Sequence, residues 1–120
     1  MMEIETHQPN GSRIAEIKSS SIVIASAQDG LDLLGNLYYQ GFDKLIIHAV
    51  NITPDFFDLK DGMAGEILQK FSNYRVRLAI VGDFTQYSSK SIKDFIYESN
   101  QKRQISFVAS TSEALQILGK

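Results

Sequence analysis

The fold class is decided by residues 76–83, which read Val-Arg-Leu-Ala-Ile-Val-Gly-Asp. Residues 76–81 are almost continuously apolar over the length of a strand, which predicts a strand that is buried on both faces. Gly82 and Asp83 end this strand because both residues favour a turn. Residues 44–48, Lys-Leu-Ile-Ile-His, form a second run of the same kind. Buried strands of this type are typical of parallel sheets that are covered by helices.

Segments with the apolar periodicity of helices precede and follow these two strands in the sequence. In four segments of the chain, apolar residues recur at three- and four-residue steps, which is the spacing of one helical face. We expect these helices to begin at Ser26, near Gly62, at Ser88 and at Ser110, with a last strand at residues 105–108. Strands that alternate with helices in this way predict parallel pairing through right-handed crossovers.

The beginning of the chain has a different pattern. Two extended segments, one starting at Ile4 and one at residues 14–18, flank Pro9-Asn10-Gly11, which predicts a β-hairpin. Residues 22–24, Ile-Val-Ile, predict a further short strand. The predicted fold is therefore α/β, with a small mixed sheet that has an N-terminal hairpin followed by alternating helices and mostly parallel strands. No linker or repeat interrupts this pattern, so we expect residues 1–120 to form a single α/β domain.

The composition argues against several classes of protein. The 120 residues include no cysteine, which excludes a disulfide framework, a thiolate metal site and a cysteine nucleophile. Twelve basic and fourteen acidic residues give a net charge of −2, which argues against a nucleic-acid-binding protein. Only two histidines are present, so a histidine-rich metal site is not expected. We therefore predict no metal, no cofactor and no nucleic-acid partner.

The cellular location is predicted from the start of the chain and from the length of its apolar runs. Residues 1–5 are acidic where a secretory leader would be basic. The longest apolar runs, at residues 45–47 and 78–81, are far shorter than a membrane-spanning helix. We expect a cytoplasmic protein that does not associate with a membrane.

Several longer phrases resemble a known family. Residues 51–60 read Asn-Ile-Thr-Pro-Asp-Phe-Phe-Asp-Leu-Lys, and residues 64–71 read Ala-Gly-Glu-Ile-Leu-Gln-Lys-Phe. The similarity continues through residues 79–84 and 94–100. With these phrases the chain resembles a bacterial family that is named only as Domain of Unknown Function family 4180. The resemblance extends over nearly the whole chain, is weakest before Ile22, and implies no particular activity.

A more distant resemblance concerns the fold. The succession of residues 79–83, a helix, the strand at residues 105–108 and a final helix with Glu113-Ala114-Leu115 is similar to STAS and other SpoIIAA-like domains. This resemblance implies a small mixed-sheet module with a regulatory or ligand-binding role and no catalysis. In STAS domains that carry a phosphorylation switch, a serine begins a helix after a buried strand. This chain has Asp61 or Gly62 at that position, so the resemblance does not extend to the switch.

Polar residues follow both buried strands. Asp55, Asp58 and Asp61 come after the first of them, and Asp83 comes after the second. Because the carboxyl ends of parallel strands share the edge at which open α/β folds bind ligands, we expect these carboxylates to lie together. They can equally stabilise the first turns of helices, and no calcium-loop motif is present, so no metal site is predicted. The predicted ligand or partner site comprises Asn51, Asp55, Phe56, Phe57, Asp58, Asp61, Asp83 and Phe84.

The aromatic residues of this site shape the predicted function. Phe56 and Phe57 are adjacent, and neighbours on a helix cannot point in the same direction, so we expect one ring to be partly exposed. An exposed ring beside carboxylates suits a groove for a protein partner or an apolar pocket for a small molecule. We therefore predict a non-catalytic regulatory or ligand-binding protein, with a protein or a small molecule as its partner. A homodimer is a further alternative.

The alternative function is a small hydrolase or transferase at the same edge of the sheet. His48 ends the first buried strand, and Asp58 or Asp83 would supply its carboxylate partner through a hydrogen bond. His7 lies in the predicted hairpin and is interpreted as a surface residue. The sequence contains neither a Gly-x-Ser-x-Gly elbow nor a phosphate-binding loop, so no catalytic residue is assigned.

Overall fold

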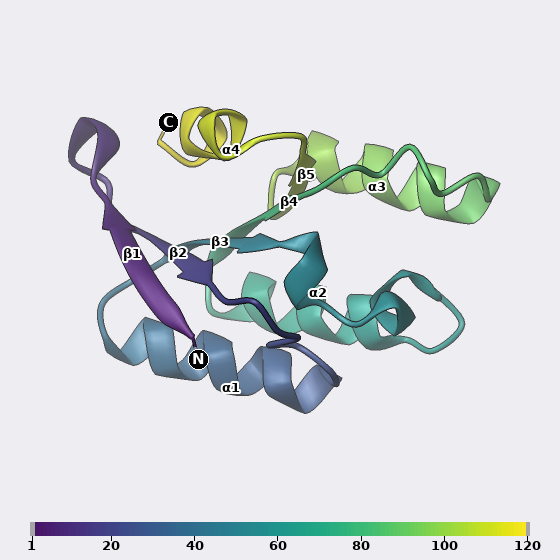
Figure 1. Ribbon diagram of the computed structural model, residues 1–120, viewed down its shortest axis with the longest axis horizontal. Helices are drawn as coiled ribbons and strands as arrows, with labels where there is room; N and C mark the ends of the chain where they lie inside the picture. The colour runs from purple at the N-terminus through teal and green to yellow at the C-terminus, as the bar shows by residue number, and fades with distance from the viewer. Residues whose placement is uncertain (1, 120) are drawn as a thin grey trace.

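The computed structural model of the protein describes residues 2–119, in which strands and helices alternate (Figure 1). The strands are β1 (Glu3–His7), β2 (Ile14–Lys18), β3 (Lys44–His48), β4 (Arg77–Val81) and β5 (Ile105–Val108). The helices are α1 (Ala27–Tyr39), α2 (Met63–Asn73), α3 (Lys90–Lys102) and α4 (Thr111–Leu118), with short 3₁₀ helices η1 (Pro9–Gly11), η2 (Ala49–Asn51) and η3 (Pro54–Phe57). Within residues 2–119, none of the helices has the length and apolar character that crossing a membrane requires.

The five strands form one mixed sheet in which they lie in the order of the chain, from β1 to β5. β1 and β2 form the antiparallel hairpin, and β2 to β5 run parallel to one another. The predicted α/β fold with its mixed sheet, N-terminal hairpin and alternating helices is therefore confirmed. The similarity to STAS domains stays a prediction.

Helices cover the two faces of the sheet unequally. The larger core combines residues of α1, α2 and α3 with alternate strand residues, namely Ala15, Ile17, Leu45, Ile47, Leu78, Ile80, Ile105 and Phe107. α4 lies on the opposite side of the sheet from α1 and α2, where Ala114 and Leu118 belong to a smaller core (Figure 1). Because α4 has eight residues and contacts chiefly β3, β4 and β5, the β1–β2 part of this face is left largely without a helix over it.

Serine side chains begin three of the helices. Ser26 and Ser110 cap α1 and α4 as predicted, because each hydroxyl accepts a hydrogen bond from the backbone N–H three residues ahead. Ser89, and not the predicted Ser88, caps α3 in the same way. Gly62 precedes α2 with a positive φ of 83°, a conformation that glycine adopts without steric cost. The predicted start of this helix near Gly62 is therefore confirmed.

The short strand predicted at residues 22–24 is wrong. Ile24 forms a single bridge to Ile52, and the N–H groups of Val23 and Ile24 both donate to the carbonyl of Asn51, but no ladder of paired residues forms. The backbone N–H of Thr53 donates to the carbonyl of Ile24 at 2.8 Å, which completes this local contact. Ser26 caps α1 only two residues later, so the chain turns into the helix before a longer ladder can form.

Candidate functional site

β3 and β4 end side by side, and a cleft opens at their carboxyl ends. The strand register pairs His48 with Val81, so the residues that follow the two strands meet at one edge of the sheet. The cleft has a volume of about 810 Å³. Phe57 belongs to its apolar wall, and His48, Asp83 and Tyr87 contribute polar groups to its lining. This is the edge at which we expected a site from the sequence.

Asp83 is an ionised carboxylate of this cleft. Its Oδ1 accepts hydrogen bonds from the hydroxyl of Thr85 at 2.6 Å and from the backbone N–H of Thr85 at 3.0 Å. These bonds hold the pKa of Asp83 below its ordinary value of 3.8. Gly82 lets the chain pass close to Ala49 here, because a Cβ at this position would lie 2.7 Å from the Cβ of Ala49. The close approach of the two loops therefore sets the position of Asp83.

Phe56 and Phe57 are both buried, with exposed fractions of 1% and 7%, so the prediction that one ring is exposed is wrong. η3 is a short turn that contacts α2 and carries Phe57 toward the segment that follows β4. There the ring of Phe57 stacks on Tyr87 with centroids 4.6 Å apart and lies 5.9 Å from the ring of Phe84. Burial raises the pKa of the Tyr87 phenol. η3 thus presents no exposed phenylalanine to a protein partner.

Asn51 is a predicted site residue that supports the fold. Its side chain is buried, and its amide donates hydrogen bonds of 2.8 Å to the carbonyls of Ser19 and Ser21. These bonds tie the end of η2 to the loop between β2 and α1. Asn51 is not one of the residues that line the cleft.

Replacing Asn51 with leucine should lower the free energy of unfolding by about 1–3 kcal/mol, because two carbonyls lose a buried donor. Urea denaturation of wild type and variant measures this loss. Asn36→Leu is the matched control, since Asn36 is exposed on α1, and its effect should stay within about 0.5 kcal/mol. Equal losses in the two variants would contradict the supporting role of Asn51.

The remaining predicted residues do not converge on the cleft. Asp55, Asp58 and Asp61 are exposed, and Oδ1 of Asp58 accepts a local hydrogen bond from the N–H of Lys60 at 3.2 Å. Asp58 lines a separate hollow of about 430 Å³, and Phe84 lines another of about 450 Å³. Of the predicted site residues, the cleft is lined by Phe57 and Asp83.

A buried carboxylate that the sequence analysis missed supports His48. Glu16 lies in the middle of β2, and its side chain is only 5% exposed. Its Oε2 is 2.7 Å from Nε2 of His48, and its Oε1 is 2.8 Å from Nε2 of His7. The expected hydrogen bond from His48 to Asp58 or Asp83 is therefore wrong, since the parallel pairing of β2 with β3 directs the imidazole to Glu16.

The interpretation of His7 as a surface residue is also wrong, because β1 brings it to Glu16 from the other side. The signal in the sequence was the glutamate itself, which interrupts the apolar run Ile14-Ala15-Glu16-Ile17. A carboxylate buried in a strand needs hydrogen-bond donors, and the two histidines of the chain stand on β1 and β3, the strands that flank β2. The partners of Glu16 can be recognised only when the order of the strands in the sheet is known, and the prediction of individual strands does not give this order.

Glu16 stays charged despite its burial. Burial by itself raises the pKa of a carboxyl, but hydrogen bonds from His48 and His7 and the nearby charge of Lys18 bring the pKa of Glu16 below its ordinary value of 4.5. An ionised carboxylate can only accept hydrogen bonds, so Nε2 of His48 carries the hydrogen. Glu16 therefore orients the imidazole and sets its tautomer, with Nδ1 as the second polar atom of the ring.

A family model described as "Domain of unknown function (DUF4180)" matches residues 9–118. This range contains β2 to β5 and all four helices, and with them Glu16, His48 and Asp83. Comparison with curated proteins gave no match.

Proposed function

The chain belongs to the DUF4180 family, whose description names no activity, and we propose from the cleft itself that the protein binds a small molecule there. The proposed ligand lies at the carboxyl ends of β3 and β4 and is not chemically changed. One observation carries the proposal: an imidazole backed by buried Glu16 and the ionised carboxylate of Asp83 line the same apolar-walled cleft. Binding without catalysis agrees with the regulatory role that the STAS resemblance implies.

The size and position of the cleft support this proposal. Its volume of about 810 Å³ is within the range of roughly 300–1,000 Å³ that is usual for sites of small organic ligands. The carboxyl ends of parallel strands are the place where open α/β sheets bind their ligands. A wall of apolar side chains with a few polar groups is also the usual composition of such sites.

The charges of the cleft favour a ligand with a neutral or cationic head. Asp83 is ionised, and the carboxylate of Glu16 lies directly behind His48. Within residues 2–119, no lysine or arginine lines the cleft. The ligand that fits best has an apolar body that packs beside Phe57 and a hydrogen-bond donor, such as an ammonium group, for Asp83.

A pair of probes with the same apolar body and opposite charge tests this prediction. At saturating concentration, 2-phenylethylamine should raise the thermal midpoint of unfolding, and 3-phenylpropionate should not. A ligand at one hundred times its dissociation constant stabilises the folded state by about 2.7 kcal/mol, which corresponds to a shift of several degrees. Differential scanning fluorimetry measures both shifts.

Substitutions locate the binding of the probe. Asp83→Asn should abolish the shift caused by 2-phenylethylamine, because it removes the negative charge at the cleft. Asp61→Asn is the matched control, since it removes the same charge from an exposed position that does not line the cleft. Equal shifts with the two probes, or a shift that survives Asp83→Asn, would contradict the proposed ligand chemistry.

A second candidate function is acid–base catalysis in the same cleft. It is favoured by the 2.7 Å hydrogen bond between His48 and Glu16, the arrangement in which a carboxylate orients an imidazole base. Hydrolysis of p-nitrophenyl esters tests it with the purified protein. Turnover that His48→Gln abolishes would favour catalysis, and rates equal to those of His48→Gln would favour binding alone.

A further inference from the structure

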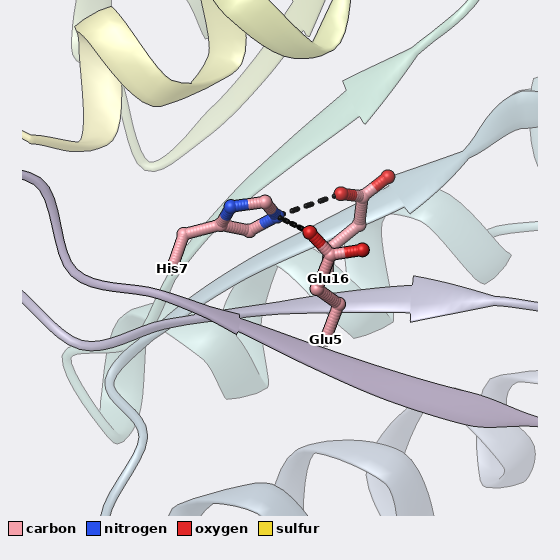
Figure 2. A group of neighbouring side chains, drawn as sticks. All are labelled: Glu5, His7 and Glu16. Carbon is pink, nitrogen blue, oxygen red and sulfur yellow. Dashed lines mark hydrogen bonds and ion pairs between the residues drawn. The ribbon is translucent and has the colours of Figure 1, made fainter.

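Glu16 contacts polar side chains other than His48, and these side chains form a cluster on β1 and β2. Glu5 and His7 of β1 and Glu16 of β2 each direct one side-chain atom toward a common point, and these atoms lie within 4.8 Å of one another. Figure 2 shows the three side chains pointing toward one another, with one ring nitrogen of His7 facing both carboxylates. The cluster lies on the part of the sheet face that α4 leaves open.

The strand register explains why the two carboxylates meet. β1 and β2 are antiparallel, and Glu5 lies directly opposite Glu16. Like charges that are directly opposite across a strand pair repel each other and destabilise the sheet. His7 lies two residues from Glu5 and therefore on the same face, next to both carboxylates. This arrangement needs a compensating positive charge.

Lys18 compensates only part of the negative charge. Its Nζ lies 2.6 Å from Oε1 of Glu5. Oε2 of Glu5 instead lies 3.4 Å from Nε2 of His7. Two carboxylates and one ammonium leave one uncompensated negative charge when the imidazoles are neutral. A divalent cation at the common point would neutralise it.

The distances from His7 to the two carboxylates are close to those around a small tetrahedral ion. Zinc binds imidazole nitrogen and carboxylate oxygen at about 2.0–2.2 Å, so neighbouring ligand atoms around it lie about 3.3–3.6 Å apart. Nε2 of His7 is 3.4 Å from the oxygen of Glu5 and 2.8 Å from the oxygen of Glu16. An ion that replaces the shared hydrogen would need these atoms to separate by less than about 1 Å.

We propose that Glu5, His7 and Glu16 bind a divalent ion of the zinc type, with water as the fourth ligand. The buried Glu16 supplies an anchored oxygen, and Glu5, whose side chain is 47% exposed, leaves the ion open to water on one side. His48 holds the other oxygen of Glu16 and acts as the partner that orients this ligand. The imidazole ligand favours Zn²⁺ over Mg²⁺ and Ca²⁺, which prefer oxygen alone.

Calorimetric titration of the untagged full chain, stripped of metal with EDTA and dialysed, tests the proposal with ZnCl₂ as the probe. We expect one Zn²⁺ per chain and no measurable heat with MgCl₂. Substitution of Co²⁺ should give the intense visible absorption of a tetrahedral site. His7→Gln and Glu5→Gln should each weaken zinc binding by more than 100-fold, because each removes a ligand. Circular dichroism confirms that both variants are folded.

Matched variants separate this site from other modes of zinc binding. Glu3→Gln removes the same charge as Glu5→Gln from the same strand and should leave zinc binding unchanged. His48→Gln removes only the orienting partner and should weaken it about 10- to 100-fold. Absence of binding to the wild type, or affinity that survives both His7→Gln and Glu5→Gln, would overturn the proposal.

The proposal of a zinc site and the proposal of a ligand in the cleft can be rejected independently of each other. Asp83→Asn, which should abolish binding of 2-phenylethylamine, leaves all three proposed zinc ligands in place and should not change zinc affinity. His7→Gln should weaken zinc binding by more than 100-fold without changing the response to the amine. A protein that binds zinc and not the amine, or the reverse, retains one proposal and rejects the other.

Discussion

The Phe57→Ala variant should be less stable than the wild type by about 3–5 kcal/mol, the usual cost of removing a buried phenylalanine. The ring of Phe57 stacks on Tyr87 and meets the ring of Phe56 edge-on at 5.1 Å, so its loss leaves a cavity bounded by rigid neighbours. A small domain has a total stability of about 5–15 kcal/mol. The thermal midpoint should accordingly fall by roughly 10–20 °C.

Urea denaturation followed by circular dichroism measures the loss in Phe57→Ala. Tyr97→Ala is the control, because Tyr97 is an aromatic residue that is 66% exposed on α3. Its unfolding free energy should stay within about 0.5 kcal/mol of wild type. A loss below about 1 kcal/mol for Phe57→Ala would show that the aromatic cluster reorganises to fill the space.

The double variant His7→Leu/His48→Leu should lose about 3–5 kcal/mol of stability at neutral pH. Both side chains that hydrogen-bond Glu16 are removed, and the buried carboxylate keeps its charge without a donor. Lys18 is held by Glu5 and so compensates only in part. Each single variant should lose less than half as much, because one donor remains. The measurements are made in EDTA to exclude metal.

The pH dependence of the unfolding free energy should show that the charge of Glu16 causes the loss of stability in the double variant. In the wild type the pKa of Glu16 lies below 4.5, so its stabilising contribution is present above this pH and is lost as the pH falls through the lowered pKa. In the double variant, burial without donors should raise the pKa of Glu16, so the folded state accommodates the protonated carboxyl better than the charged one. The stability of this variant should therefore fall as the pH rises through the raised pKa. The difference in unfolding free energy between the two proteins should shrink from pH 7 to pH 4.

A triple variant provides the control for this prediction. His7→Leu/His48→Leu/Glu16→Leu removes the carboxylate together with its partners and should regain most of the lost stability, since apolar replacement of a buried charged group is often neutral or stabilising. A triple variant as unstable as the double variant would attribute the loss to packing and would contradict the role of Glu16.

The elements that could be predicted from the sequence are those with a strong local pattern. Residues 44–48 are β3 as expected, and residues 76–81 contain β4, because a continuous apolar run needs no distant partner to be recognised. Ser26 and Ser110 identify their helices because a capping bond spans only three residues. The carboxyl edge was also predictable, since it follows from parallel pairing alone.

The composition of the site could not be predicted in the same way. Glu16 and His48 are 32 residues apart in the chain and meet only because β2 pairs with β3. Phe57 is buried by Tyr87, thirty residues further along, so local helical geometry could not reveal its environment. The prediction of a short strand at residues 22–24 was wrong for the opposite reason, because β propensity was present but the neighbouring segment allowed only the single bridge between Ile24 and Ile52.

The order of the strands has a consequence for the synthesis of the protein. Each strand pairs with the one made immediately before it, so every new β–α unit can add to an edge that already exists as the chain leaves the ribosome. The pairing of Glu16 with His7 and His48 requires β1, β2 and β3 alone. A nascent chain that has released β3 therefore already contains the zinc ligands and their orienting histidine, while the ligand cleft is completed only after β4 and Tyr87 have emerged.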